Sequence, residues 1–205
     1  MKSISGYLEE DKNKWADRPY ISTKENGVWR ARTFREVTDD IRGLSKSLLA
    51  RGLEQKNIML CSENSYEWIL LYFGIMGYVG TCVPVDKEWT AWDLQNTLSA
   101  VSVSAVFYSR SRGERFRSVM KQAPAIAWFC IEDVLDDMIR EGKTSPEPLH
   151  GRTQTEQTSM ILFTSGTTNV PKAIPLTQNN LFANWETLYR RTPMTERDIS
   201  YVFLP

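Results

Sequence analysis

The sequence has few residues that bind metals or form disulfides. It contains three cysteines and one histidine in 205 residues. Cys61, Cys82 and Cys130 are far apart in the chain and His150 stands alone, so no metal site with the usual ligand spacing can be assembled from them. Each cysteine lies in an apolar run, which predicts buried, reduced thiols and a cytoplasmic protein.

A surplus of positive charge is also absent, because 25 lysines and arginines balance 25 aspartates and glutamates. This balance argues against a nucleic-acid-binding protein, which needs a basic surface. The first residues are charged and lack an apolar core, so we expect no signal peptide. Residues 68–85 carry no charge, but three glycines and Pro84 divide them into a helix and a strand, and we expect no transmembrane segment.

Helix and strand signals alternate between residues 57 and 131. The apolar runs are continuous, as in strands that are buried on both faces of a sheet. With right-handed crossovers they predict an α/β fold with a doubly wound, mostly parallel sheet flanked by helices. The expected strands are residues 57–61, 81–85, 105–108 and 126–131, and the expected helices are residues 66–78, 90–100 and 113–121.

Three threonines mark expected helix starts, one within residues 57–131 and two outside that range. Thr33 forms a capping box with Glu36, and Thr90 and Thr177 precede further helical patterns. Asn26-Gly27 predicts a tight hairpin turn. The chain therefore divides into a helix and hairpin (residues 1–33), a core of strands and helices (34–140), a polar connection (141–158) and a last segment (159–205) with expected strands at 160–163, 173–176 and 201–204.

The most specific pattern lies between the strands expected at 160–163 and 173–176. A run of small hydroxyl residues surrounds a single glycine, and a Pro-Lys pair follows. Such a loop offers backbone N–H groups, hydroxyls and one cation to a phosphate chain. The Walker pattern needs a Gly-Lys-Ser/Thr triplet and the dinucleotide pattern needs three spaced glycines, and neither occurs here. The candidate phosphate-binding residues are Thr164, Ser165, Gly166, Thr167, Thr168 and Lys172.

Residues 164–173 resemble the signature of the adenylate-forming superfamily, which contains acyl-CoA synthetases, peptide-synthetase adenylation domains and beetle luciferase. The family usually has glycine where Asn169 and Ala173 stand, and histidine where Gln178 stands. The segments 29–50, 77–86 and 201–205 resemble further family motifs in the same order. The resemblance implies that the fold is part of the family's large N-terminal domain.

The resemblance also implies a two-step reaction. A carboxylate attacks the α-phosphorus of ATP to give an acyl-adenylate and pyrophosphate, and a thiol, usually that of coenzyme A, then displaces AMP. The candidate loop would hold the β- and γ-phosphates, with Asn169 and Gln178 as further candidates. The implied partners are a carboxylic acid, ATP and coenzyme A, with Mg²⁺ bound mostly by residues outside this chain.

We therefore interpret the chain as part of an AMP-forming acyl-CoA synthetase. Residues 62–68 look most like the fatty-acid members. An amino-acid adenylation domain of a peptide synthetase and a non-catalytic nucleotide-binding or interaction module remain alternatives. The family's adenine-binding segment and its C-terminal domain with the catalytic lysine are missing, so we expect an incomplete N-terminal domain from a truncated enzyme or a broken gene, which is inactive alone and holds no catalytic residue.

Other polar and aromatic residues fit ordinary surface or packing roles. We expect the basic run from Arg110 to Lys121 and the acidic residues between Glu132 and Asp137 to be solvated helix faces. We expect Trp89 and Trp92 to serve in packing rather than as a platform for base stacking.

Overall fold

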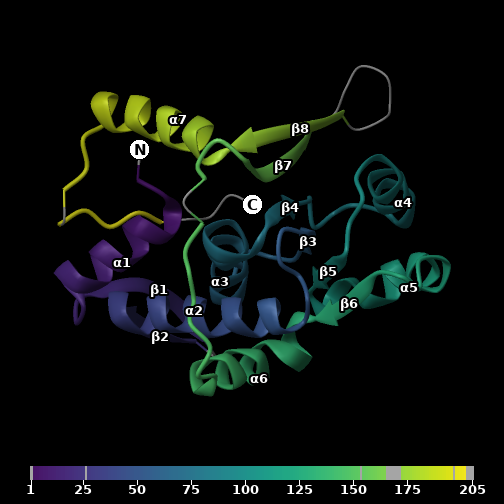
Figure 1. Ribbon diagram of the computed structural model, residues 1–205, viewed down its shortest axis with the longest axis horizontal. Helices are drawn as coiled ribbons and strands as arrows, with labels where there is room; N and C mark the ends of the chain where they lie inside the picture. The colour runs from purple at the N-terminus through teal and green to yellow at the C-terminus, as the bar shows by residue number, and fades with distance from the viewer. Residues whose placement is uncertain (1, 26, 153, 165–171, 196, 202–205) are drawn as a thin grey trace.

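The computed structural model describes residues 2–25, 27–152, 154–164, 172–195 and 197–201 (Figure 1). Its main sheet has six strands in the order β6-β5-β3-β4-β7-β8, and all neighbours are parallel except β7 and β8. The prediction of a doubly wound, mostly parallel sheet is confirmed. The strands are β3 (Asn57–Cys61), β4 (Thr81–Pro84), β5 (Ala105–Tyr108), β6 (Ala127–Cys130), β7 (Thr158–Thr164) and β8 (Lys172–Thr177).

Helices cover both faces of the sheet. Along β3, Ile58 and Leu60 join one apolar cluster with α2, α3 and α6, whereas Met59 and Cys61 join a second cluster with α4 and α5. Successive side chains of a strand point to opposite faces, so a continuous apolar run serves both clusters. The helices are α1 (Ile4–Trp15), α2 (Phe34–Ala50), α3 (Tyr66–Gly74), α4 (Ala91–Ala100), α5 (Gly113–Gln122), α6 (Ile131–Thr144) and α7 (Gln178–Arg191).

The expected threonine caps are present. Thr33 accepts a hydrogen bond from the Glu36 backbone and donates its own backbone N–H to the Glu36 carboxylate at 2.7 Å. Thr90 and Thr177 form the same reciprocal pattern at the starts of α4 and α7. These bonds satisfy N–H groups that have no partner inside the helix.

The end of the helix expected at residues 66–78 differs from an ordinary α-helix. After α3 the chain continues as a π-helix, η1 (Ile75–Val79), which closes with a bond from the Gly80 N–H to the Ile75 carbonyl. A Cβ on Gly80 would lie 2.3 Å from the Lys56 carbonyl oxygen, so only glycine allows the chain to pass there into β4.

The expectation of a strand at 126–131 followed by a connection from 141 was partly wrong. The strand ends at Cys130, and α6 runs from Ile131 to Thr144, so the polar connection begins later. The helix forms because its apolar residues recur at helical spacing and pack on α2. Arg152 then anchors the connection, since its backbone N–H bonds the Gly77 carbonyl and its guanidinium bonds the carbonyls of Gly80 and Thr158.

Residues 1–33 contain α1 and a separate two-stranded sheet. Its strands, β1 (Pro19–Glu25) and β2 (Val28–Thr33), are antiparallel, as the Asn-Gly pair predicts. The strand expected at 201–204 lies almost entirely outside the described residues. Among the helices that the structure describes, none combines the length and the apolar character needed to cross a bilayer.

Candidate functional site

The two ends of the predicted phosphate loop lie opposite each other. Thr164 is the last residue of β7, Lys172 is the first of β8, and they pair directly across the antiparallel ladder. Both are exposed. Ser165, Gly166, Thr167, Thr168 and Asn169 lie outside the described residues. The strands therefore bring one hydroxyl and one ammonium group together at the carboxyl end of β7, and in open α/β sheets ligands bind at the carboxyl ends of the parallel strands.

Lys172 is available for an anion. Within the part of the chain that the structure describes, its ammonium group makes no ion pair with a carboxylate. A phosphate chain would meet a lysine that pairs with no described carboxylate, opposite Thr164 in the ladder. The described residues at the loop's ends therefore fit a phosphate group in charge and in hydrogen-bonding capacity.

Ala173 stands where the resembled family has glycine. It pairs with Phe163 across the hairpin, and both side chains pack against the second apolar cluster. The Trp89 ring meets the Phe163 ring edge-on, with 5.6 Å between ring centroids. The packing role expected for Trp89 is confirmed, whereas Trp92 is 56% exposed and that expectation was wrong. The extra methyl of Ala173 belongs to this apolar contact.

Gln178 is committed to contacts far from the loop. Its side chain is buried, its Oε1 accepts the Ile4 backbone N–H at 2.8 Å, and its Nε2 donates to the Met76 carbonyl at 3.0 Å. Both partners are groups at helix ends that lack a partner within their own helix. One amide therefore joins the start of α7 to α1 and η1. A contact between Gln178 and a nucleotide stays a prediction.

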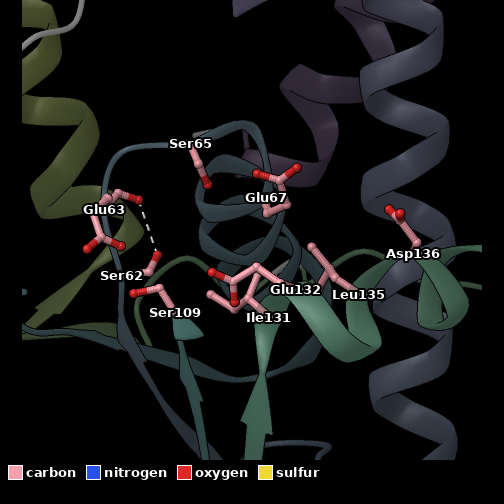
Figure 2. A pocket seen from close by; sticks show the side chains of 9 residues that line it. All are labelled: Ser62, Glu63, Ser65, Glu67, Ser109, Ile131, Glu132, Leu135 and Asp136. Atoms are coloured by element: carbon pink, nitrogen blue, oxygen red, sulfur yellow. Dashed lines mark hydrogen bonds between the residues drawn. The ribbon is translucent and has the colours of Figure 1, made fainter. Parts of the chain in front are cut away.

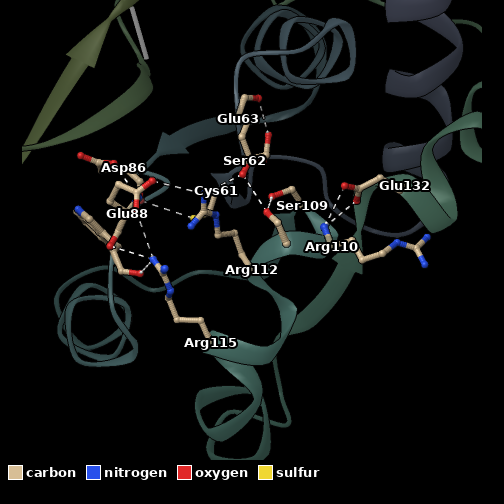
Figure 3. Close-up of polar contacts among 12 residues, drawn as sticks. Cys61, Ser62, Glu63, Asp86, Glu88, Ser109, Arg110, Arg112, Arg115 and Glu132 are labelled. Carbon is tan, nitrogen blue, oxygen red and sulfur yellow. Dashed lines mark hydrogen bonds and ion pairs between the residues drawn. The ribbon is translucent and has the colours of Figure 1, made fainter. Parts of the chain in front are cut away.

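A cluster of charged residues lies at the carboxyl ends of β3, β4 and β5 (Figure 3). Glu63 follows β3 and accepts hydrogen bonds from Ser111 at 2.9 Å and from Arg112 at 2.8 Å. Partial burial would raise the pKa of Glu63, but hydrogen bonds from Ser109, its own backbone, Ser111 and Arg112 outweigh this and lower the pKa to about 2. We call Glu63, Glu88, Ser111, Arg112 and Arg115 the carboxyl-end cluster.

The basic run was expected to be a solvated helix face, which holds for Arg115 and was wrong for Arg112. The Arg112 side chain is only 13% exposed and contacts both Glu63 and Glu88, whereas Arg117 is 64% exposed and pairs with Glu114 of its own helix. A usable signal was the presence of Glu63 and Glu88 just after two predicted strands, because parallel strands end at one edge of the sheet. On α6, the acidic residues are mostly exposed, as expected.

A cavity of about 330 Å³ opens beside this cluster, between the ends of β3 and β5 and the start of α6 (Figure 2). Four carboxylates line it, so a negative charge entering it would meet repulsion. The cavity is therefore a poor site for a triphosphate, and the end of the β7–β8 hairpin is the better one. Its polar lining residues are Ser62, Glu63, Ser65, Glu67, Ser109, Glu132 and Asp136.

The remaining candidate chemistry is limited. In the described ranges, no group of three histidines, cysteines or acidic residues is placed to hold a metal ion. Cys61 and Cys82 are buried free thiols, as expected, and Cys130 is half-buried. Burial raises the pKa of Cys61 to about 12, so its thiol stays protonated and inert at neutral pH.

The fold and the hairpin define a doubly wound α/β domain in which Thr164 and Lys172 face each other at a strand end. The chain belongs to the family of AMP-binding enzymes, whose model matches residues 8–205. This match confirms the resemblance that residues 164–173 carry.

The individual proteins that the chain matches have low sequence identity to it. The chain is 26% identical over 205 residues to a crotonobetaine/carnitine–CoA ligase of Citrobacter koseri, with 90% of this chain and 38% of the ligase covered. It is 22% identical over 196 residues to the human long-chain-fatty-acid–CoA ligase ACSBG2, with 87% of this chain and 29% of the ligase covered. The chain therefore spans well under half the length of these relatives.

The fold has solved counterparts. A long-chain-fatty-acid–CoA ligase from Archaeoglobus fulgidus superposes with a TM-score of 0.82 at 18% identity, over 96% of this chain and 40% of that chain. At that identity the likeness establishes the fold, and the arrangement of strands and helices described above is that of this ligase's matching part.

Proposed function

We propose that this chain supplies the nucleotide-phosphate grip of an ATP-dependent, AMP-forming acid–thiol ligase. The observation that carries the proposal is the facing of Thr164 and Lys172 at the end of β7, in a chain of the AMP-binding enzyme family. Ser165, Gly166, Thr167 and Thr168, which lie between them in sequence, are proposed to share the contact, with Asn169 as a further candidate.

The proposed contribution to the reaction is electrostatic. As a carboxylate attacks the α-phosphorus of ATP, the bond to the departing pyrophosphate breaks and negative charge accumulates on it. A lysine ammonium and a threonine hydroxyl held in place at that position lower the energy of this charge without further reorganisation. Magnesium would neutralise part of the same charge when bound to the phosphates. The described residues supply the cation and the hydroxyl.

The acyl substrate is proposed to be a fatty acid. Support comes from residues 62–68, which look like fatty-acid members, and from the long-chain ligases among the relatives. The thiol acceptor is proposed to be coenzyme A, and the location cytoplasmic. An amino-acid-activating enzyme and a non-catalytic binding module are the alternatives. Ligand binding is the first property to measure.

Calorimetric titration with pyrophosphate and with ATP tests the grip. We expect Lys172→Ala to weaken pyrophosphate binding about tenfold, the effect of losing one charge-assisted contact. Lys121→Ala removes another exposed lysine, from α5, and should change the affinity less than twofold. Equal affinities for the two variants would refute the proposed grip.

A second experiment addresses substrate and turnover. The sequence predicts that these 205 residues alone do not form adenylates. Pyrophosphate exchange with a panel of fatty acids and amino acids, each compared with Lys172→Ala, measures this directly. Exchange above that of the variant would contradict the inactivity, and the acid that supports it would decide between the two enzyme classes.

A further inference from the structure

Two arginines reach from the segment after β5 to the loop after β4 (Figure 3). The Arg112 Nη2 atom lies 2.8 Å from Glu63 Oε1 and 3.5 Å from Glu88 Oε1. The Arg115 Nη1 atom donates to the backbone carbonyls of Glu88 at 3.1 Å and Trp89 at 3.4 Å. Together they fix both the side chain and the backbone of the loop that carries Trp89.

Trp89 connects this fixed loop to the β7–β8 hairpin. Its ring rests edge-on against Phe163, which directly precedes Thr164. β4 and β7 pair at Cys82 and Met160, and Phe163 lies past this pair towards the end of β7. The aromatic contact is therefore an attachment of the functional end of β7 to the core that does not depend on the parallel ladder.

The energetics favour a positioning effect over a large effect on global stability. Glu88 is 63% exposed and Arg115 is 39% exposed, and ion pairs in such positions contribute little free energy. Hydrogen bonds to two successive carbonyls instead restrict the geometry of the loop. Arg112 is more enclosed, and its Nε makes no hydrogen bond in the described part of the chain, so the two carboxylates decide where it sits.

We propose that Arg112 and Arg115 are positioning residues, which hold Trp89 against Phe163 and so fix Thr164 opposite Lys172. The structural part of this inference stands on the contacts above. Its consequence for ligand binding rests on the proposed function. Both arginines act through Trp89, so neither is expected to touch the nucleotide.

Amide hydrogen exchange, followed by NMR on the unliganded protein, tests the structural part. We expect Arg115→Ala to speed exchange about fivefold at the pair of amides, Phe163 and Ala173 or Thr164 and Lys172, that is hydrogen-bonded across the hairpin, the equivalent of one lost hydrogen bond. Amides of β5 and β6 should keep their rates, as should the unfolding midpoint. Trp89→Leu should reproduce the local change without altering either arginine.

Arg117→Ala is the matched control, because Arg117 lies on the same helix and, among the described residues, forms an ion pair with Glu114 alone. Arg115→Lys keeps the charge beside Glu88 but replaces the planar guanidinium, whose Nη1 reaches both carbonyls, with a compact ammonium, and it should show an intermediate rate. If Arg115→Ala exchanges like Arg117→Ala at the hydrogen-bonded hairpin amides, the positioning role is overturned.

Pyrophosphate titration separates this inference from the proposed function. If Lys172→Ala weakens binding and Arg115→Ala weakens it about three- to fivefold, both hold. If Lys172→Ala weakens binding and Arg115→Ala does not, the positioning role fails alone. If Lys172→Ala has no effect, the grip fails, and the exchange rates still decide whether the arginines order the hairpin.

Discussion

Gly43 and Gly142 meet backbone to backbone where α2 crosses α6. A Cβ added to Gly142 would lie 1.7 Å from the Gly43 carbonyl oxygen, and one added to Gly43 would lie 2.7 Å from the Ile139 carbonyl oxygen. Neither position tolerates a methyl group unless the two backbones separate. This crossing closes the helical layer over one face of the sheet, and the first prediction follows from it.

Gly142→Ala should lower the free energy of unfolding by about 2–3 kcal/mol, because overpacking against backbone cannot be relieved by a side-chain rotation. Urea unfolding followed by circular dichroism measures it. Gly113→Ala is the control, since its Cβ would meet only a Tyr108 ring atom at 3.4 Å, and it should change stability by less than about 0.5 kcal/mol. Equal effects of the two variants would contradict the tight crossing.

Gln178→Ala should destabilise the protein by about 2–4 kcal/mol. The change leaves the Ile4 N–H and the Met76 carbonyl without their partner in a buried setting, and each such group costs free energy. Chemical denaturation gives the value. Gln95→Ala removes an exposed amide that bonds Gln122, and it should be close to neutral. A near-neutral Gln178→Ala would show that the amide does not join these helices.

Ala173→Gly restores the residue that the family usually has. It should cost about 1 kcal/mol of stability, because it removes a methyl from the contact with Phe163 and adds backbone freedom in a strand. Pyrophosphate affinity should change less than twofold. Tighter binding by the variant would show that the methyl obstructs the ligand.

Glu63→Gln should alter the acid limb of the stability curve. The folded state lowers the pKa of Glu63 to about 2 from 4.5, so its stabilising effect is complete above pH 4.5 and is lost as pH falls towards 2. The variant should be less stable at pH 7 and should lose less stability between pH 4.5 and 2. Thermal unfolding at several pH values measures both, with the exposed Glu54→Gln as control. Parallel curves for wild type and Glu63→Gln would contradict the hydrogen-bonded carboxylate.

Local chemistry made much of the fold predictable. The capping box of Thr33 and Glu36 marks the start of α2, and the short continuous apolar run from Ile58 to Cys61 favours a strand that is buried on both faces. The start of α6 was missed because Cys130 makes no side-chain capping bond and the apolar run continues from strand into helix. The π-helix was missed because the close approach of Gly80 to Lys56 depends on tertiary contact.

The candidate site likewise has a part that the sequence predicts and a part that it does not. Thr164 and Lys172 were predictable, because a strand end, a hydroxyl run and a lysine are consecutive in sequence. The role of Arg112 was not predictable from its own helix, since its partners Glu63 and Glu88 come from two other loops. Contacts assembled from three segments leave no periodic signal in any one of them.

The junction between β4 and β7 has a consequence for the order of folding. Each crossover among strands β3 to β6 passes over at most one strand, whereas the chain that leaves β6 at the sheet edge must pass β5, β3 and β4 before β7 can pair with β4. Closing so long a loop costs entropy before any contact is gained, so we expect β7 and β8 to dock after the other strands have assembled. Until they dock, the side of β4 that β7 will cover offers unpaired backbone groups to any strand nearby, and this late step is where misassembly between chains would begin.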